Sequence, residues 1–395
     1  AKRLPALHPY VNVKGGTIFL SDKLIGALRR LIQSLTNLPS LANVVSVREI
    51  DRAVQKSYRT WMERGLQPLG QEFVDDVVSS LLGDVKLYTF LIQIEGVDLK
   101  IQETLQLGTF RLQRSNPTLF EGIKFGGVLD RPTIYSQFKD GPWLIGSVKG
   151  SQDVALEQFE YRAELIVGIL GICGAILYKG SIWRSRVRAV TSPHGHRKAV
   201  SSLRWEDGGE NPSLSRNWGF EQDLPLTAES VTYLLEICFL EQLSSLPDIE
   251  DRSELQDAIV RSIYWFAESY KDRTPIMQFV KLWTCVECFF AIDKVEITEL
   301  NAAGISTILT FAGYEIVDLK DYPEFKRRVK KMYDLRSRAV HRAEFGHVET
   351  QDLEDLSLWA AWIVISMVSL AEKGYKTLRQ VHEQTSRLDK ISYRL

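Results

Sequence analysis

Residues 321–347 read DYPEFKRRVKKMYDLRSRAVHRAEFGH, and the fold expected for the C-terminal half follows from this segment. Asp321 can cap a helix, Pro323 suits its first turn, and Glu324 can reach back to the cap. Apolar residues then recur every three or four positions, which predicts that one face of this helix is buried in a core. The segment therefore indicates a packed helix within a helical domain.

The apolar stripe of this helix contains a charge, Arg336. The stripe itself consists of Phe325, Val329, Met332 and Val340, which share one face at about 100° per residue. An arginine cannot lose its proton, so Arg336 requires an anion, a hydrogen-bonding partner or a wet cleft. His341 lies about 140° around the helix from Arg336. It therefore looks away from the stripe unless the helix distorts or a second subunit completes the site.

Five further helices are expected in the C-terminal half: residues 227–246, about 249–270, 274–293, about 300–312 and 350–372. In the third of these, Glu287 interrupts an apolar face in the same way that Arg336 interrupts the later one. Opposite charges on the apolar faces of helices in one bundle are natural partners, so we predict that Glu287 and Arg336 lie within salt-bridge distance. An ion pair that orients the arginine and does no chemistry is the alternative to a catalytic role for Glu287.

The first half of the chain combines helices and strands. Ser21 predicts the cap of a first helix, and apolar spacing predicts three more over residues 50–65, 73–83 and 153–178. Alternating apolar residues predict strands over residues 87–94, 105–113 and within 120–150. In the helix over 153–178, Gly168 and Gly171 indicate close packing against another helix.

These elements predict an α+β fold in two parts. Residues 1–222 are expected to form a mixed α/β module, and residues 223–395 an all-α helical bundle. The boundary is expected within residues 208–225, because this segment is rich in Gly, Asn, Ser and Pro.

Composition indicates a globular protein that does not cross a membrane. The 395 residues are 45% hydrophobic and 10% aromatic, which suffices for packed cores. The net charge of −1 gives no global attraction to nucleic acid, so such binding would require local basic clusters. Four cysteines in apolar contexts, no signal peptide and apolar runs too short to span a bilayer predict a cytoplasmic location.

One local basic cluster spans residues 179–205. It contains seven Lys or Arg residues, two tryptophans and no acidic residue. Cations that follow phosphates and rings that stack on bases are what a single-stranded nucleic acid requires, so Arg184, Arg186 and Arg188 are expected to contact RNA. A solvated basic loop that its aromatic residues anchor to the core is the alternative.

The spacing Arg336-x4-His341 near the end of a helix resembles the motif of the HEPN superfamily. The residue after the arginine is often polar in that family, and here it is Ser337. The helix LWTCVECFFAID (Leu282–Asp293), followed by a short helix and then YDLRSRAVHR, is similar to the HEPN branch of ApeA-type anti-phage defence proteins. The resemblance covers the helical C-terminal part and leaves the first half nearly untouched.

This resemblance implies an endoribonuclease that needs neither a metal ion nor a cofactor and acts as a homodimer. Arg336 would clamp the phosphate, His341 would serve as general base or acid, and Glu287 would be the third residue of the catalytic set. Four basic residues would bind the RNA backbone, with a solvated helix face as the alternative for each: Lys330, Lys331, Arg338 and Arg342. By the same resemblance, the first module would be a sensor or regulator that meets a phage or antitoxin protein, and the setting would be anti-phage defence by degradation of host RNA.

Two other functions are compatible with the same residues. In the first, the helical half is a non-catalytic RNA-binding or interaction module, in which Arg336 and His341 have only structural roles. In the second, the chain is a toxin that an antitoxin partner silences.

Three further motifs indicate no metal site or nucleotide cofactor. Cys285-x2-Cys288 has no second pair at zinc spacing and lies among apolar residues of a helix, so both cysteines are expected in the core. His194-x-His196 has no Cys, Asp or Glu nearby. The glycine-rich residues 122–127 are not followed by the Gly-Lys-Ser/Thr of a phosphate-binding loop.

Overall fold

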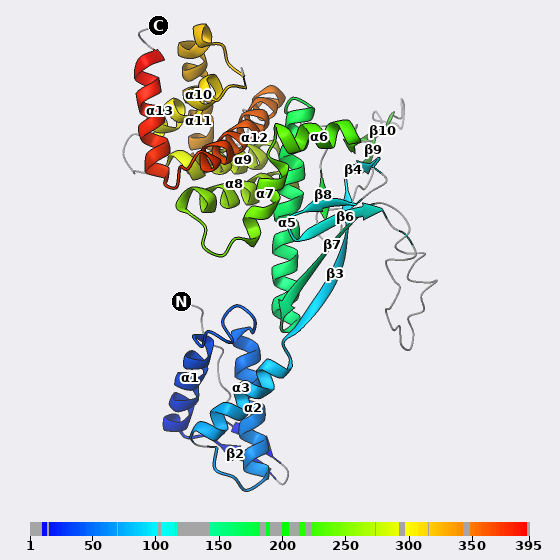
Figure 1. Ribbon diagram of the computed structural model, residues 1–395, viewed down its shortest axis with the longest axis vertical. Coiled ribbons are helices and arrows are strands. Elements are labelled where there is room, and N and C mark those ends of the chain that lie inside the picture. Colours follow the sequence, from blue (N-terminus) through cyan, green and yellow to red (C-terminus); the bar gives the residue numbers. More distant parts are fainter. Residues whose placement is uncertain are drawn as a thin grey trace. The chain divides into compact units, whose positions relative to one another are not determined.

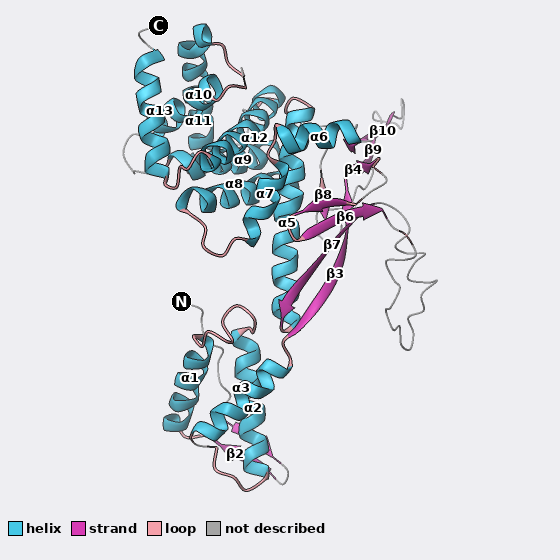
Figure 2. Ribbon diagram, viewed as in Figure 1, coloured by secondary structure: helices cyan, strands magenta, loops and turns pink. Residues whose placement is uncertain are grey.

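Helices make up most of the fold, and a small sheet lies in the N-terminal half (Figure 2). The predicted α+β class is therefore confirmed. The computed structural model describes residues 10–13, 16–68, 70–101, 104–114, 116, 142–181, 187–189, 200–204, 213–217, 223–272, 274–291, 297–314, 316–342 and 348–392.

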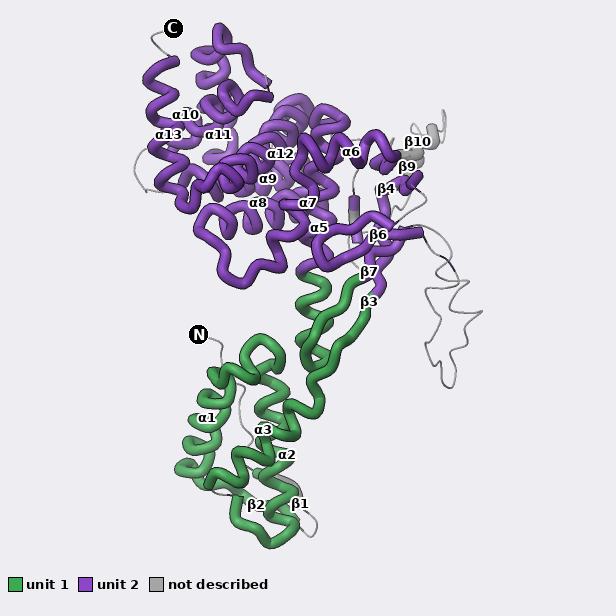
Figure 3. The backbone as a smooth tube through the Cα atoms, viewed as in Figure 1, with its two compact units in different colours: residues 1–90, 146–161 green, residues 91–145, 162–395 purple. Residues whose placement is uncertain are grey.

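The chain divides into two units, each made of two separate segments (Figure 3). The first unit contains Ala1–Phe90 and Gly146–Tyr161, and the second contains Leu91–Ile145 and Arg162–Leu395. This division differs from the boundary predicted near residue 222, which lies inside the second unit. There, strand β11 (Leu224–Leu226) pairs in parallel with β4 (Val97–Leu99), so one sheet joins the segments on either side of that boundary.

The first unit contains a β-hairpin and three helices. Its elements are β1 (Tyr10–Val13), β2 (Gly16–Phe19), α1 (Asp22–Thr36), α2 (Val47–Glu63) and α3 (Gln71–Gly83). Ser21 caps α1 as predicted, because its side chain accepts a hydrogen bond from the Leu24 N–H. Ser46 and Glu49 form a capping box at the start of α2. The apolar faces of the three helices share one core, in which Val54 is fully buried.

Five strands form one sheet in the order β5-β6-β7-β3-β8. They are β3 (Lys86–Glu95), β5 (Leu105–Leu107), β6 (Phe110–Arg114), β7 (Pro142–Gly150) and β8 (Arg188–Ala189). Strand β6 is antiparallel to β5 and to β7, and β8 is antiparallel to β3. A separate antiparallel pair consists of β9 (Val200–Arg204) and β10 (Ser213–Asn217). The predicted strands at 87–94 and 105–113 are confirmed, and residues 117–141 lie outside the described residues.

The second unit carries the C-terminal helices (Figure 1). They are α6 (Ala228–Glu236), α7 (Leu240–Ser245), the 3-10 turn η2 (Leu246–Asp248), α8 (Glu254–Lys271), α9 (Pro275–Phe290), α10 (Ile297–Phe311), the 3-10 turn η3 (Leu319–Asp321), α11 (Tyr322–Arg342), α12 (Thr350–Glu372) and α13 (Leu378–Ser392). No strand follows β11 in the part of the chain that the structure describes. Helix α8 packs along α9, and Phe266, Phe279 and Trp283 are fully buried between the helices of this unit.

Helix α5 (Gln152–Leu177) packs closely on α8, as its glycines predict. A Cβ atom at Gly168 would lie 2.8 Å from the backbone oxygen of Ile263. At Gly171 it would lie 3.2 Å from the ring of Tyr270. The contact at Gly168 leaves no room for a larger residue, and the one at Gly171 would require the Tyr270 ring to shift, so the glycines allow the two helices to approach.

The helix predicted over residues 227–246 is wrong in its length. Helix α6 ends at Glu236, and Phe239 then adopts a left-handed backbone conformation with φ of 51° before α7 begins. The turn allows Cys238 and Leu240 on either side of Phe239 to be fully buried. No glycine or proline marks this break, which is why the sequence pattern does not predict it.

Two details predicted for α11 are also wrong. Asp321 does not cap the helix, because it belongs to the 3-10 turn that runs directly into Tyr322. The buried stripe ends before Val340, which is 47% exposed, and it is joined by Lys326, which is buried. Only the residues after Ala339, from Val340 to Arg342, are therefore exposed at the end of α11.

Helix α12 is the one described helix that is long and apolar enough to cross a bilayer. Most of its residues are buried against other helices, including Trp359, Ile363 and Met367. This burial agrees with the prediction of a core helix at this position.

Candidate active site

Glu287 on α9 and Arg336 on α11 form the predicted ion pair. The Arg336 Nη2 atom donates to Glu287 Oε2 over 2.7 Å. The side chains are only 19% and 12% exposed, respectively, so water screens the pair weakly. Each residue stands on the apolar face of its helix, and the packing of α9 against α11 brings the two faces together.

The surroundings of the pair are mainly aromatic and apolar. Burial raises the pKa of Glu287 above its usual value, although the charge and hydrogen bond of Arg336 act in the opposite direction. The Arg336 guanidinium lies 5.8 Å from the ring centre of Tyr333, which in turn meets Trp283 edge to face at 5.6 Å. Burial, followed by the charge of Glu287, also raises the pKa of Tyr333.

Arg336 keeps hydrogen-bonding capacity beyond the ion pair. A guanidinium has five N–H donors, and Glu287 accepts from only one nitrogen atom of this one. The Nε atom of Arg336 is buried, and it has no hydrogen-bond partner among the described residues. The guanidinium is thus fixed on one side by a carboxylate and retains donors for a further anion.

His341 lies in the last turn of α11 and is exposed. Five residues of helix separate it from Arg336, which turns its side chain about 140° away. The structure therefore does not bring Arg336 and His341 together within one chain. The helix does not distort at this point, so a shared site would require a second subunit.

The residues predicted to bind RNA fall into three groups. Lys331 and Arg342 are exposed and Arg338 is half-buried, whereas Lys330 already forms an ion pair with Glu299 of α10. Arg184 and Arg186 lie outside the described residues. Arg188 lies in β8, where its backbone pairs with Glu95 of β3.

A buried charge cluster beside this helix was not predicted. Lys326 of α11 is only 3% exposed, and its Nζ donates to Asp389 over 2.8 and 3.0 Å and pairs with Glu299 over 2.7 Å. The Tyr322 hydroxyl donates to the same Asp389 carboxylate over 2.5 Å. Burial alone would lower the pKa of Lys326, but the two carboxylates hold it above its usual value. The one sequence signal for this cluster is the position of Lys326 at the edge of the apolar stripe.

Cys285 lies in the core as predicted, whereas Cys288 is only partly buried. Cys285 is fully buried and lies 2.9 Å from the Ser262 hydroxyl, and Cys288 donates to the Thr284 carbonyl oxygen over 3.2 Å. Burial is the main cause that raises the pKa of the Cys288 thiol to about 11. Among the described residues, no group of three His, Cys, Asp or Glu side chains is arranged to hold a metal ion. Residues 122–127 and 194–196 lie outside the residues that the structure describes.

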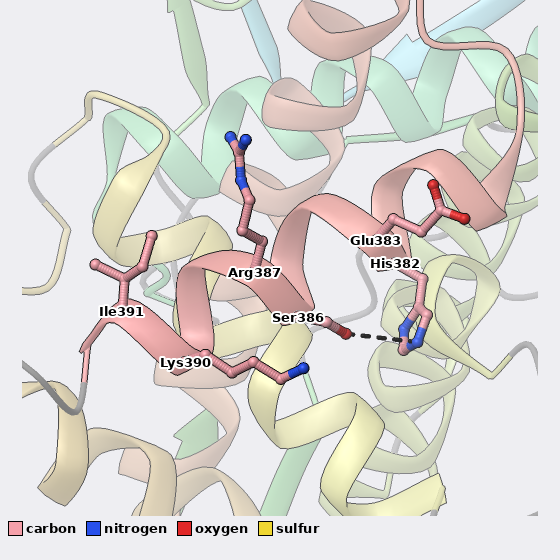
Figure 4. A pocket seen from close by; sticks show the side chains of 6 residues that line it. All are labelled: His382, Glu383, Ser386, Arg387, Lys390 and Ile391. Atoms are coloured by element: carbon pink, nitrogen blue, oxygen red, sulfur yellow. Dashed lines mark hydrogen bonds between the residues drawn. The ribbon is translucent and has the colours of Figure 1, made fainter.

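Two surface pockets lie away from the candidate residues. One of about 460 Å³ follows α13 and is lined by His382, Glu383, Ser386, Arg387, Lys390 and Ile391. In it, His382 and Ser386 lie on one side of the helix, 3.5 Å apart (Figure 4). The other, of about 320 Å³, lies between α7, α8 and α12. Neither lining includes a residue that the sequence predicts to be functional.

No protein-family model, curated protein or solved structure matches this chain.

Proposed function

We propose that the chain is a HEPN-type endoribonuclease that acts as a homodimer through its C-terminal helices. The observation that carries this proposal is the Glu287–Arg336 ion pair, which fixes an arginine with spare donors on the helix that also presents His341. An arginine held in this way is suited to a phosphate, because its planar donors match the phosphate oxygens. An exposed histidine nearby is suited to proton transfer at neutral pH.

The proposed reaction needs no group other than these side chains and the RNA. His341 takes the proton of a 2′-hydroxyl, the 2′-oxygen attacks the adjacent phosphorus, and the bond from phosphorus to the 5′-oxygen breaks. His341 of the partner subunit supplies the proton that the leaving 5′-oxygen requires. Arg336 stabilises the charge that builds on the phosphorane oxygens. The products are a 2′,3′-cyclic phosphate and a 5′-hydroxyl.

The biological setting proposed is anti-phage defence in the cytoplasm, by analogy with the ApeA-type proteins that the motif resembles. In that setting the mixed α/β part of the chain would sense the infection or regulate the nuclease. The resemblance alone supports this part of the proposal.

Replacement of His341 by alanine tests the proposal. We expect the rate of RNA cleavage to fall by about 10² to 10⁴, the usual loss when a general acid or base is removed. His382→Ala is the matched control, because it removes a histidine from α13 in the same unit and should leave the rate unchanged. The rates come from gel electrophoresis of a labelled RNA, with end-group analysis of the products and a repeat in excess EDTA, where cleavage should persist.

Cleavage by the His341→Ala protein at the wild-type rate would rule out the ribonuclease proposal in this form. One observation supports a different function in that event. Arg336 is bound to Glu287 and turned about 140° from His341, as expected for a purely structural arginine. The chain would then be a non-catalytic interaction module, and RNA binding without cleavage by the wild-type protein would identify it.

A further inference from the structure

Helix α2 of the first unit turns a row of four cations outward. At about 100° and 1.5 Å per residue, the four lie within an arc of about 80° and extend over about 17 Å of the helix. The opposite side of α2 is buried in the core of the unit, through Ile50, Val54 and Tyr58. These four cations are called the α2 ridge below: Arg48, Arg52, Lys56 and Arg59.

The α2 ridge is not neutralised by the carboxylates beside it. All four cations are exposed, and none of them has a carboxylate partner among the described residues. Glu49 faces the start of the helix, where it accepts hydrogen bonds from the Ser46 backbone N–H and the Ser151 hydroxyl. Asp51 is buried towards the core and accepts from the Gln55 amide.

Other carboxylates lie at the end of the ridge or away from it. Asp76 of α3 accepts from the Trp61 indole, which is about 180° around α2 from the centre of the ridge. Glu63, one turn beyond Arg59, is exposed on the same arc and ends the ridge. Four cations against this one carboxylate leave three uncompensated positive charges on the outer side of α2.

The α2 ridge is a rigid feature. The capping box of Ser46 and Glu49 fixes the start of the helix, and its apolar face is held in the core. Successive cations stand about 6 Å apart where they are four residues apart. A fixed row of this kind fits a stiff polymer with regularly placed negative charges. A double-helical nucleic acid is such a polymer, because it carries one phosphate for about each 1.7 Å of its axis.

The side chains around the α2 ridge favour a double helix over other polyanions. Proteins that bind a single strand stack its bases on aromatic rings, but both aromatic residues of α2, Tyr58 and Trp61, pack on the core side. A helix that binds an anionic membrane needs a free apolar face, and the apolar face of α2 is covered. A double helix hides its bases and presents its phosphates, which is what exposed cations alone can bind.

We propose that the α2 ridge binds the phosphate backbone of a double-stranded nucleic acid of any sequence. This inference assigns a ligand to the first unit, whereas the ribonuclease proposal concerns side chains of the second unit. DNA and RNA duplexes both carry the phosphodiester groups that the ridge recognises.

The test uses the full-length chain and three fluorescent probes of equal length: a DNA duplex, a 2′-O-methyl RNA duplex that cannot be cleaved, and its single strand. Binding is measured by anisotropy between about 50 and 200 mM salt. Four phosphate contacts predict a slope of log K against log salt of about −3.6 for the DNA duplex, at about −0.9 for each contact. The double variant Arg52→Gln with Lys56→Gln should reduce the slope to about −1.8 and weaken duplex binding about tenfold or more at low salt.

The matched control removes two exposed lysines from the second unit, Lys373→Gln with Lys376→Gln. It changes the net charge equally and should leave the slope and the affinity near the wild-type values. Glutamine is a good helix former, so both variants should keep the wild-type circular dichroism spectrum.

Three results would overturn the inference. Equal losses in the two double variants would mean that net charge alone governs binding. Wild-type affinity of the Arg52 and Lys56 variant would show that the duplex is bound elsewhere or not at all. Tighter binding of the single strand, or of phosphatidylserine vesicles, than of either duplex would identify a different ligand. Ridge-dependent binding of only one duplex would instead identify DNA or RNA as the source of the phosphates.

The outcome is distinct from that of the cleavage test. If duplex binding depends on the α2 ridge but the wild-type protein never cleaves RNA, the ribonuclease proposal fails and the binding site stands. If RNA is cleaved in a His341-dependent manner but duplex binding ignores the ridge, only the present inference fails.

Discussion

Glu287 is subject to two opposing effects. Burial disfavours its charged form, and the guanidinium of Arg336 favours it; the net result is a pKa above the usual value. The ion pair is therefore a poor source of stability, but each charge depends on the other because both side chains are largely removed from water.

Removing one partner should be costly for that reason. We expect Glu287→Ala to lower the free energy of unfolding by about 3 kcal/mol, since it leaves the Arg336 charge half-buried without an anion. Glu287→Gln should cost less, because an amide oxygen can still accept from the guanidinium. Urea unfolding at neutral pH measures both, and a loss below about 0.5 kcal/mol for the alanine variant would contradict the buried pair.

Comparison of the wild-type protein with the Glu287→Gln variant reveals the direction in which the pKa of Glu287 is shifted. Below the ordinary carboxyl pKa of 4.5, Glu287 is protonated in both the folded and the unfolded chain. As the pH rises from 4.5 through the raised pKa of the folded state, the stabilising contribution of the buried neutral acid is lost. Glu287→Gln lacks this titration, so the stability of the wild type relative to this variant should fall across that interval. A relative stability that rises with pH would show that Arg336 outweighs burial.

At the scale of single elements, α11 and α13 are joined by a buried charge. Lys326 of α11 is almost fully enclosed and binds Asp389 of α13, whereas Lys330, one turn later, is 40% exposed and has Glu299 as its one ion-pair partner among the described residues. The two lysines share one helix and one partner but differ in burial.

Their alanine variants should differ accordingly. Lys326→Ala should lower the free energy of unfolding by about 3 to 5 kcal/mol, because it strands the carboxylate of Asp389. Lys330→Ala should cost less than about 1 kcal/mol, since exposed ion pairs contribute little. Urea unfolding gives both values, and hydrogen exchange should show reduced protection of α13 only in the first variant. Equal losses would mean that burial does not set the strength of this contact.

The sequence predicts those features whose cause is local. Ser21 marks the start of α1, and the apolar faces of α9 and α11 each single out one charge, which leads to the Glu287–Arg336 pair. It does not predict α13, because polar Thr385 and Ser392 occupy two of the three buried positions of this helix and interrupt its apolar face. Without that helix, the partner of Lys326 could not be found, because Asp389 is 63 residues away along the chain.

The sequence predicts the candidate site only in part, because the partners of its charged residues lie on helices that are distant along the chain. Spacing alone identifies Arg336 and His341, and it also predicts that they diverge around the helix. Spacing does not reveal which cations of α11 have partners, because Glu299, Asp355 and Asp389 belong to other helices. The sequence therefore predicts an RNA contact for Lys330, which in the structure forms an ion pair with Glu299.

At the scale of the whole molecule, the chain has two units with separate cores. The core of the first unit includes Leu41, and that of the second includes Leu309 of α10; both side chains are buried. Units with separate cores commonly unfold as separate transitions.

We expect two transitions in calorimetry. Leu41→Ala and Leu309→Ala should each destabilise their own unit by about 2 to 5 kcal/mol, the usual cost of this change in a core. Each variant should therefore shift one transition and leave the other in place. A single transition that both variants shift equally would show that the units unfold together.

The distribution of charge on α11 also determines how the molecule meets a charged surface. With a net charge of −1 and an isoelectric point near 6.7, the chain is almost neutral as a sum. A charged resin, however, responds to the local field of the face that it touches. On the exposed side of α11, Arg327 and Lys331 lie beside the exposed carboxylates of Glu324 and Asp334. The local field of this side is therefore mixed in sign, and α11 should add little to retention on a cation exchanger although the helix is rich in lysine and arginine.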